Sequence, residues 1–114
     1  TVDAGCTTAV RIVGGDRIEI VGNYINGAFT TTIGCIENVT TDTTDILIDD
    51  NVLKNRTAAS TKVFVLTATS TAHFTRNRMS ILGGTAPITA AAGTSGGDNS
   101  YSNAVGVAAT QTSI

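Results

Sequence analysis

The stretch Asp45-Ile46-Leu47-Ile48-Asp49-Asp50-Asn51-Val52-Leu53 decides the fold, because the chain carries its pattern twice more. The other two copies are Arg17-Ile18-Glu19-Ile20-Val21-Gly22-Asn23-Tyr24-Ile25 and Thr71-Ala72-His73-Phe74-Thr75-Arg76-Asn77-Arg78-Met79. Each copy has two apolar residues spaced by two, then an asparagine, then another apolar residue two positions later. The asparagines at 23, 51 and 77 give steps of 28 and 26 residues, and a weaker fourth copy is expected at Asn103.

A second row of short apolar segments runs between these copies. Its members begin at Val10, Ile36, Val63 and Ile88, so the steps are 26, 27 and 25 residues. Two rows that advance by nearly the same amount indicate an internal repeat, and repeats of 20 to 50 residues are typical of solenoids and propellers.

The residue types indicate strands rather than helices. Thr, Val, Ile, Gly and Asn dominate, and no stretch keeps apolar residues at helical spacing through several turns. Short strands that recur in this way bury their apolar faces by stacking into parallel sheets about 4.8 Å apart per coil. The sequence therefore predicts an all-β fold: a single-stranded parallel β-helix, or solenoid, of about four coils with roughly 26–28 residues per coil.

Residues 1–92 are predicted to form the coils, and residues 93–114 a Gly/Ser/Asn-rich loop with a final coil or cap. The alignment places Ile20, Ile48 and Phe74 in one inward ladder, with Ile18, Ile46 and Ala72 in another. Asn23, Asn51 and Asn77 are expected to stack at a tight corner, because asparagine tolerates left-handed backbone and its amide can bond across coils. Neither end has a polar cap, as expected of a piece of a longer chain or of an end covered by another subunit.

The segments Ile18 to Ile25, Ile46 to Leu53 and Phe74 to Met79 resemble the right-handed parallel β-helix superfamily, which includes pectate-lyase-like enzymes and bacteriophage tail spikes. The resemblance covers about residues 8–92. It implies a right-handed coil, assembly as a homo-oligomeric trimer, and a place in a virion tail or another extracellular structure.

Composition excludes some function classes. The chain has 114 residues, with 7 basic and 9 acidic side chains and a formal net charge of −2. No basic field is available for a nucleic-acid backbone, and no apolar run is long enough to span a membrane. Cys6 and Cys35 have no metal-ligand spacing, so no metal and no cofactor are predicted.

The candidates for chemistry are Asp49, Asp50 and Arg76. A β-helix that cleaves a sugar chain needs a carboxylate pair, or carboxylates that hold Ca²⁺ beside a basic side chain. The alternative is structural: Arg76 lies in the row of Asp50, one coil along, where the two would form an exposed ion pair of little energetic value. The structural interpretation is favoured, so no catalytic residue is assigned, and the lone His73 is expected to be an ordinary surface residue.

Outward apolar residues predict a subunit interface formed by Leu47, Val52 and Tyr24. The expected function is that of a structural β-helical segment of a phage tail spike, a tail fibre or a similar extracellular appendage, with a host-surface polysaccharide as a second partner. The alternatives are a polysaccharide lyase or hydrolase fragment of the same superfamily, or a non-catalytic adhesin or glycan-binding solenoid.

Overall fold

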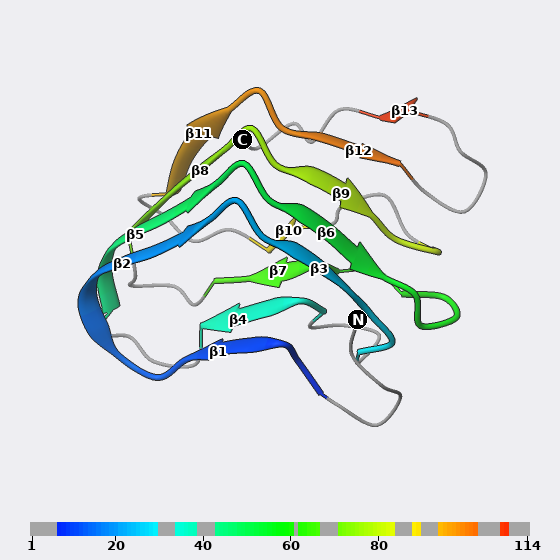
Figure 1. The fold of residues 1–114 in the computed structure, drawn as a ribbon, viewed down its shortest axis with the longest axis horizontal. Coiled ribbons are helices and arrows are strands. Elements are labelled where there is room, and N and C mark those ends of the chain that lie inside the picture. The colour runs from blue at the N-terminus through cyan, green and yellow to red at the C-terminus, as the bar shows by residue number, and fades with distance from the viewer. Residues whose placement is uncertain are drawn as a thin grey trace.

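A computed structural model describes residues 7–29, 34–38, 43–60, 62–66, 71–83, 88–89, 94–102 and 108–109. All regular secondary structure in these residues is β-strand (Figure 1). The strands are β1 (Val10–Ile12), β2 (Gly15–Val21), β3 (Tyr24–Gly27), β4 (Ile36–Asn38), β5 (Thr43–Asp49), β6 (Val52–Asn55), β7 (Phe64–Val65), β8 (Ala72–Thr75), β9 (Arg78–Ser80), β10 (Ile88–Thr89), β11 (Thr94–Gly97), β12 (Ser100–Ser102) and β13 (Ala108–Ala109). No helix in this part of the chain is long and apolar enough to cross a membrane.

The described strands form three sheets, which the chain visits in rotation. The first sheet has the order β1-β4-β7-β10, the second β11-β8-β5-β2 and the third β13-β12-β9-β6-β3. All strand pairs are parallel except β12 with β13, which is antiparallel and covers the last edge of the third sheet. Three consecutive strands therefore make one layer, and Figure 1 shows the layers lying one above another. The prediction of an all-β chain with parallel strands is confirmed.

The register places equivalent apolar residues of successive layers side by side. Ile20 pairs with Ile48 and Ile48 with Phe74 in the second sheet, while Ile25, Leu53, Met79 and Tyr101 form a row in the third. Alternation explains the burial: in β5 the side chains of Ile46 and Ile48 are buried, and Leu47 between them is half-buried.

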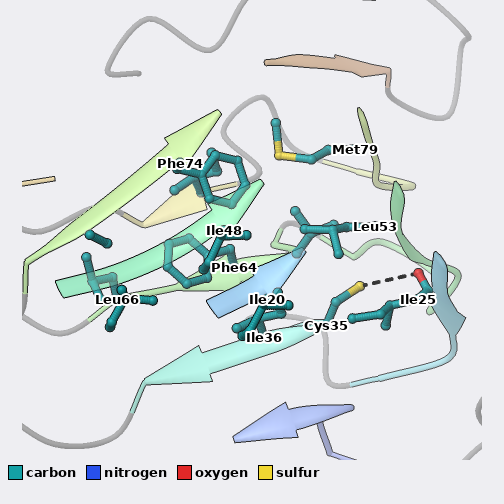
Figure 2. Close-up of a cluster of buried hydrophobic side chains, with 14 of the residues drawn as sticks. Ile20, Ile25, Cys35, Ile36, Ile48, Leu53, Phe64, Leu66, Phe74 and Met79 are labelled. Atoms are coloured by element: carbon teal, nitrogen blue, oxygen red, sulfur yellow. Dashed lines mark hydrogen bonds between the residues drawn. The ribbon is translucent and has the colours of Figure 1, made fainter. Parts of the chain in front are cut away.

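These rows meet in one core between the three sheets, as Figure 2 shows. The rings of Phe64 and Phe74 stack there with centroids 5.1 Å apart and an interplanar angle of 18°. The first sheet contributes Ile36, Phe64 and Ile88 in one row. The predicted row placed Val63 in that position, one residue too early; Val63 is also buried, but just before the strand.

The tight corner between the second and third sheets is a two-residue bend. At this corner, the residues with positive φ are Gly22 (71°), Asp50 (54°), Arg76 (51°) and Asp98 (59°). Each directly precedes an asparagine. The expectation that the asparagines themselves take left-handed backbone is therefore wrong: the residue before each asparagine turns the chain, and this leaves the amide free to bond between layers.

The C-terminal part of the stack also differs from the prediction. Residues 94–97 and 100–102, expected as part of a loop, form β11 and β12, which pair in register with β8 and β9. The Gly/Ser-rich stretch that was expected to be a loop is therefore part of the stack. The fourth corner asparagine is Asn99 rather than Asn103, and Asn103 lies outside the described residues.

Candidate functional site

The most regular polar feature of the molecule is the asparagine row at the corner. The backbone N–H of Asn23 donates to Asn51 Oδ1 at 2.9 Å, that of Asn51 to Asn77 Oδ1 at 3.0 Å, and that of Asn77 to Asn99 Oδ1 at 3.0 Å. Each Nδ2 also donates to the Oδ1 of the next asparagine, at 3.0 to 3.1 Å. The row therefore joins all four layers.

The same side chains also bond to the layer before them. Nδ2 of Asn51 donates to the carbonyl of Ile20 at 2.8 Å, and Nδ2 of Asn77 donates to the carbonyl of Ile48 at 2.9 Å. Asn51 and Asn77 are only 1% and 0% exposed. Buried amides are tolerated when their donors and acceptors are paired, so this row is a structural device that fixes the stacking of the layers.

The signal that reveals Asn99 is a dipeptide. Asp98-Asn99 repeats Asp50-Asn51, and both aspartates have the left-handed backbone of the bend. The step from Asn77 to Asn99 is only 22 residues, shorter than the earlier steps of 28 and 26. A search of the sequence for asparagines at a constant spacing of 26 to 28 residues therefore misses Asn99.

Arg76 forms a bidentate ion pair with Asp49. Its Nε donates to one carboxylate oxygen of Asp49 at 2.9 Å, and its Nη2 donates to the other. Arg76 pairs with Asp49 and not with the predicted partner, Asp50, so the predicted Asp50–Arg76 ion pair is wrong. Asp50 and Arg76 do occupy equivalent bend positions. The Arg76 guanidinium, however, bonds to Asp49, the last residue of β5 in the preceding layer.

This pair explains the local electrostatics. Hydrogen bonding to Arg76 lowers the pKa of the Asp49 carboxyl below its usual value, and Asp49 in turn raises the pKa of Arg76. A general acid needs a raised pKa, and an arginine that acts as a base must lose its proton; the pair shifts both groups in the opposite direction. The arrangement suits an ion pair that ties two layers together rather than acid–base chemistry on a sugar.

The outer face of the second sheet carries a groove of about 410 Å³. Its floor is the outward row Glu19, Leu47, His73 and Ser95, which the strand register places on successive layers. His73 Nδ1 lies 2.9 Å from Ser95 Oγ. The lining residues are Arg17, Glu19, Asp45, Ile46, Leu47, Thr71, Ala72, His73 and Ser95. Among the described residues, no three His, Cys, Asp or Glu side chains gather closely enough to hold a metal ion.

The outer face of the third sheet carries a second groove, of about 510 Å³. Tyr24 is 58% exposed beside it, with Lys54 Nζ 5.3 Å from the ring centroid. Tyr24 and Val52 are register partners on this sheet, whereas Leu47 lies on the second sheet, around the corner. The three predicted interface residues thus belong to two faces rather than to one stripe.

Cys35 is a buried, unpaired thiol in the core. It is 0% exposed, and its Sγ lies 3.9 Å from the carbonyl oxygen of Ile25 (Figure 2). Burial raises its pKa to about 12, so the thiol carries a proton at neutral pH and is a poor nucleophile. Cys6 lies outside the described residues.

Comparison with protein-family models, with curated proteins and with solved structures finds no match to this chain.

Proposed function

We propose that the chain is a single-stranded, right-handed parallel β-helix of four coils, and that it serves as a rigid structural segment of a phage tail spike, a tail fibre or a similar extracellular appendage. One observation carries the proposal: all three sheets continue in register through successive layers, with a buried asparagine row that bonds each layer to the next. Right-handedness follows the strong preference of parallel crossover connections.

Such a stack is suited to a mechanical role. Each layer contacts its neighbours alone, so the molecule extends by adding layers and every interlayer gap is bridged by backbone and amide hydrogen bonds. Interlayer side-chain bonds add to this at the second sheet, where Thr44 Oγ1 donates to Asp16 at 2.6 Å and Thr75 Oγ1 donates to the carbonyl of Gly97 at 2.8 Å. Load along the stack is shared by many parallel bonds.

The enzymatic alternative receives less support. The candidate groups Asp49 and Arg76 bind each other, and Asp50 is an exposed bend residue. We expect no release of reducing ends and no unsaturated sugar products when the chain is incubated with a glycan panel. Product formation that disappears in Asp49→Asn would establish the enzymatic function instead.

Contact with a host-surface polysaccharide remains part of the proposal as a binding role without an assigned residue. All five aromatic side chains are described, and only Tyr24 is exposed enough to stack on a sugar ring. Binding of the purified chain to a glycan array, without cleavage, tests this role.

The proposed function as a structural segment is tested by finding where the protein is located. An antibody raised against the purified chain should label an extended appendage or a virion tail in electron micrographs. Labelling confined to the cell interior, with none on particles or surface structures, would contradict the proposal.

A further inference from the structure

The outer face of the third sheet differs from the rest of the molecule in its charge. Strands β3, β6, β9 and β12 contain no acidic residue, whereas Lys54 lies in β6, Arg78 lies in β9 and Arg56 directly follows β6. Within the described part of the chain, none of these three cations has a carboxylate within 4.0 Å. The face is therefore positively charged, although the chain as a whole has a formal net charge of −2.

The arginines on the other two sheets are paired within the molecule. Arg11 and Arg17 each have a carboxylate of the neighbouring layer within 4.0 Å, and Arg76 at the corner is bonded to Asp49. A cation that already faces a carboxylate attracts an outside anion less than an unpaired one does. The charge that is available to an anionic partner is thus concentrated on the third sheet.

This basic face holds the groove of about 510 Å³. Lys54 and Arg78 line the groove together with three serines, and none of its lining residues is acidic. In the strand register Lys54 is level with Ser80 and then Ser102, and Arg78 is level with Ser100. Ammonium and guanidinium groups only donate hydrogen bonds, whereas hydroxyls both donate and accept. The groove therefore offers partners for negative groups and, beside them, for neutral hydroxyls.

The cations are spread over the face rather than gathered at one point. Lys54 and Arg78 lie on neighbouring layers, two residues apart along the strand direction. Arg56 continues the same ladder, because its backbone N–H donates to the carbonyl of Gly27 at 2.7 Å. At about 3.3 Å per residue and about 4.8 Å per layer, the Cα atoms of Arg78 and Arg56 are about 14 Å apart. An extended ligand with several negative groups can contact all three cations at once.

Two of these cations are held in place by neutral partners. Lys54 Nζ lies 5.3 Å from the centroid of the Tyr24 ring, and Arg56 Nε donates to Asn26 Oδ1 at 2.8 Å. Such contacts position a long side chain without cancelling its charge. They also reduce the conformational entropy that the side chain loses when a ligand binds.

We propose that the outer face of the third sheet binds an acidic polysaccharide, with Lys54, Arg56 and Arg78 contacting its carboxylate or sulfate groups and the serine hydroxyls bonding to its sugar hydroxyls. The inference rests on the proposed function, because it gives the polysaccharide-binding role a surface and a chemical class of ligand. The contact is direct. The strands of this face contain no carboxylate that could hold a bridging Ca²⁺ ion, so binding does not need one.

Nucleic acid is also a polyanion, but it fits this face less well. Single strands are usually held by several aromatic rings that stack on successive bases, and Tyr24 is the only exposed aromatic residue of the chain. Three cations are few for a duplex that carries a negative charge about every 1.7 Å. An acidic polysaccharide has a lower demand for positive charge and uses the serine hydroxyls as well.

Binding of the purified chain to immobilised polymers tests the inference, with circular dichroism to show that each variant keeps its fold. Alginate presents carboxylates, dextran sulfate presents sulfates, and unmodified dextran is the neutral control with the same sugar backbone as dextran sulfate. We expect binding to at least one acidic polymer and none to dextran. This binding should weaken as salt is raised and should be unchanged by a chelator of divalent cations. The acidic polymer that binds more tightly identifies the anionic group.

Substitutions locate the contact on the third sheet. Lys54→Gln and Arg78→Gln each remove one charge from the groove, so each should weaken binding several-fold, and the chain with both changes should bind at least about tenfold more weakly. Arg17→Gln is the matched control. It removes one exposed charge from the second sheet and should leave binding unchanged.

Several results would overturn the inference. These are no binding to either acidic polymer, equal binding to dextran, or binding that requires Ca²⁺. A loss in Arg17→Gln as large as in the double variant would also reject this face, and tighter binding to single-stranded DNA than to both acidic polymers would reject the ligand class. None of these results bears on where the protein is located, so antibody labelling still tests the proposed structural function separately.

Discussion

Replacing one buried asparagine of the corner row tests directly how the layers are held together. In Asn51→Ala the chain loses the Nδ2 bonds to the carbonyl of Ile20, at 2.8 Å, and to Asn77 Oδ1, at 3.0 Å. It also loses the Oδ1 that accepts from Asn23. The side chain is 1% exposed, so water does not replace these partners without opening the corner.

The magnitude follows from these bonds. Two buried hydrogen bonds contribute about 0.5 to 1.5 kcal/mol each, and a carbonyl left without its partner adds a desolvation penalty of a similar size, so unfolding should become easier by about 2 to 4 kcal/mol. With a urea dependence of about 2 kcal/mol per molar, the midpoint should fall by about 1 to 2 M.

The matched control is Asn23→Ala, at the exposed end of the same row. Its side chain donates to the carbonyl of Val21 at 3.2 Å and to Asn51 Oδ1 at 3.1 Å, and the backbone N–H of residue 23 still satisfies that oxygen. We expect a loss below about 1 kcal/mol. Equal unfolding midpoints for the two variants, in urea titrations followed by circular dichroism, would refute the idea that the buried asparagines hold the layers together.

Three further predictions concern other parts of the core and corner. In Gly34→Ala the new Cβ would lie 2.2 Å from the carbonyl oxygen of Lys62, on a backbone with φ of 88°, so we expect a loss of at least about 2 kcal/mol in thermal or urea unfolding. Gly97→Ala, which meets open space, should change stability little, and similar losses at both sites would contradict the steric explanation. The Cys35 thiol, with its pKa raised to about 12 by burial, should resist an aromatic disulfide reagent in the folded chain and react once urea unfolds it; rapid reaction without urea would show that the core is open. Because its arginine partner lowers the folded-state pKa of Asp49, that carboxylate stabilises the fold above its unfolded pKa of about 3.9, and the contribution is lost as pH falls through the lower folded value. Asp49→Asn should therefore be less stable at neutral pH and lose less stability on acidification, and an unchanged acid profile would argue against the ion pair.

The stacking rows could be read from the sequence where apolar residues mark them. Ile18, Ile20 and their equivalents repeat beside an asparagine, and the structure pairs them in the register that this alignment gives. Of the fourth layer, Ile88 in β10 was predicted, whereas β11 and β12 were missed because they are built from Thr, Ser and Gly, with Tyr101 as the buried apolar residue in β12. Hydrophobic periodicity gives no signal where the inward residues are this small.

The chemistry of the corner was harder to predict than its position. Spacing alone places Asp50 and Arg76 in one row, and strand alternation does not describe side chains at a bend with positive φ. The Arg76 guanidinium therefore forms its ion pair with Asp49 rather than with Asp50.

The stacking of layers is tested most directly by interstrand nuclear Overhauser effects in the isotopically labelled chain. Parallel layers predict contacts from the backbone of Ile48 to that of both Ile20 and Phe74, and from the side-chain amide of Asn51 to that of Asn77. Antiparallel contacts between consecutive segments, such as 15–21 with 24–27, and no contact between residues 51 and 77 would contradict the account.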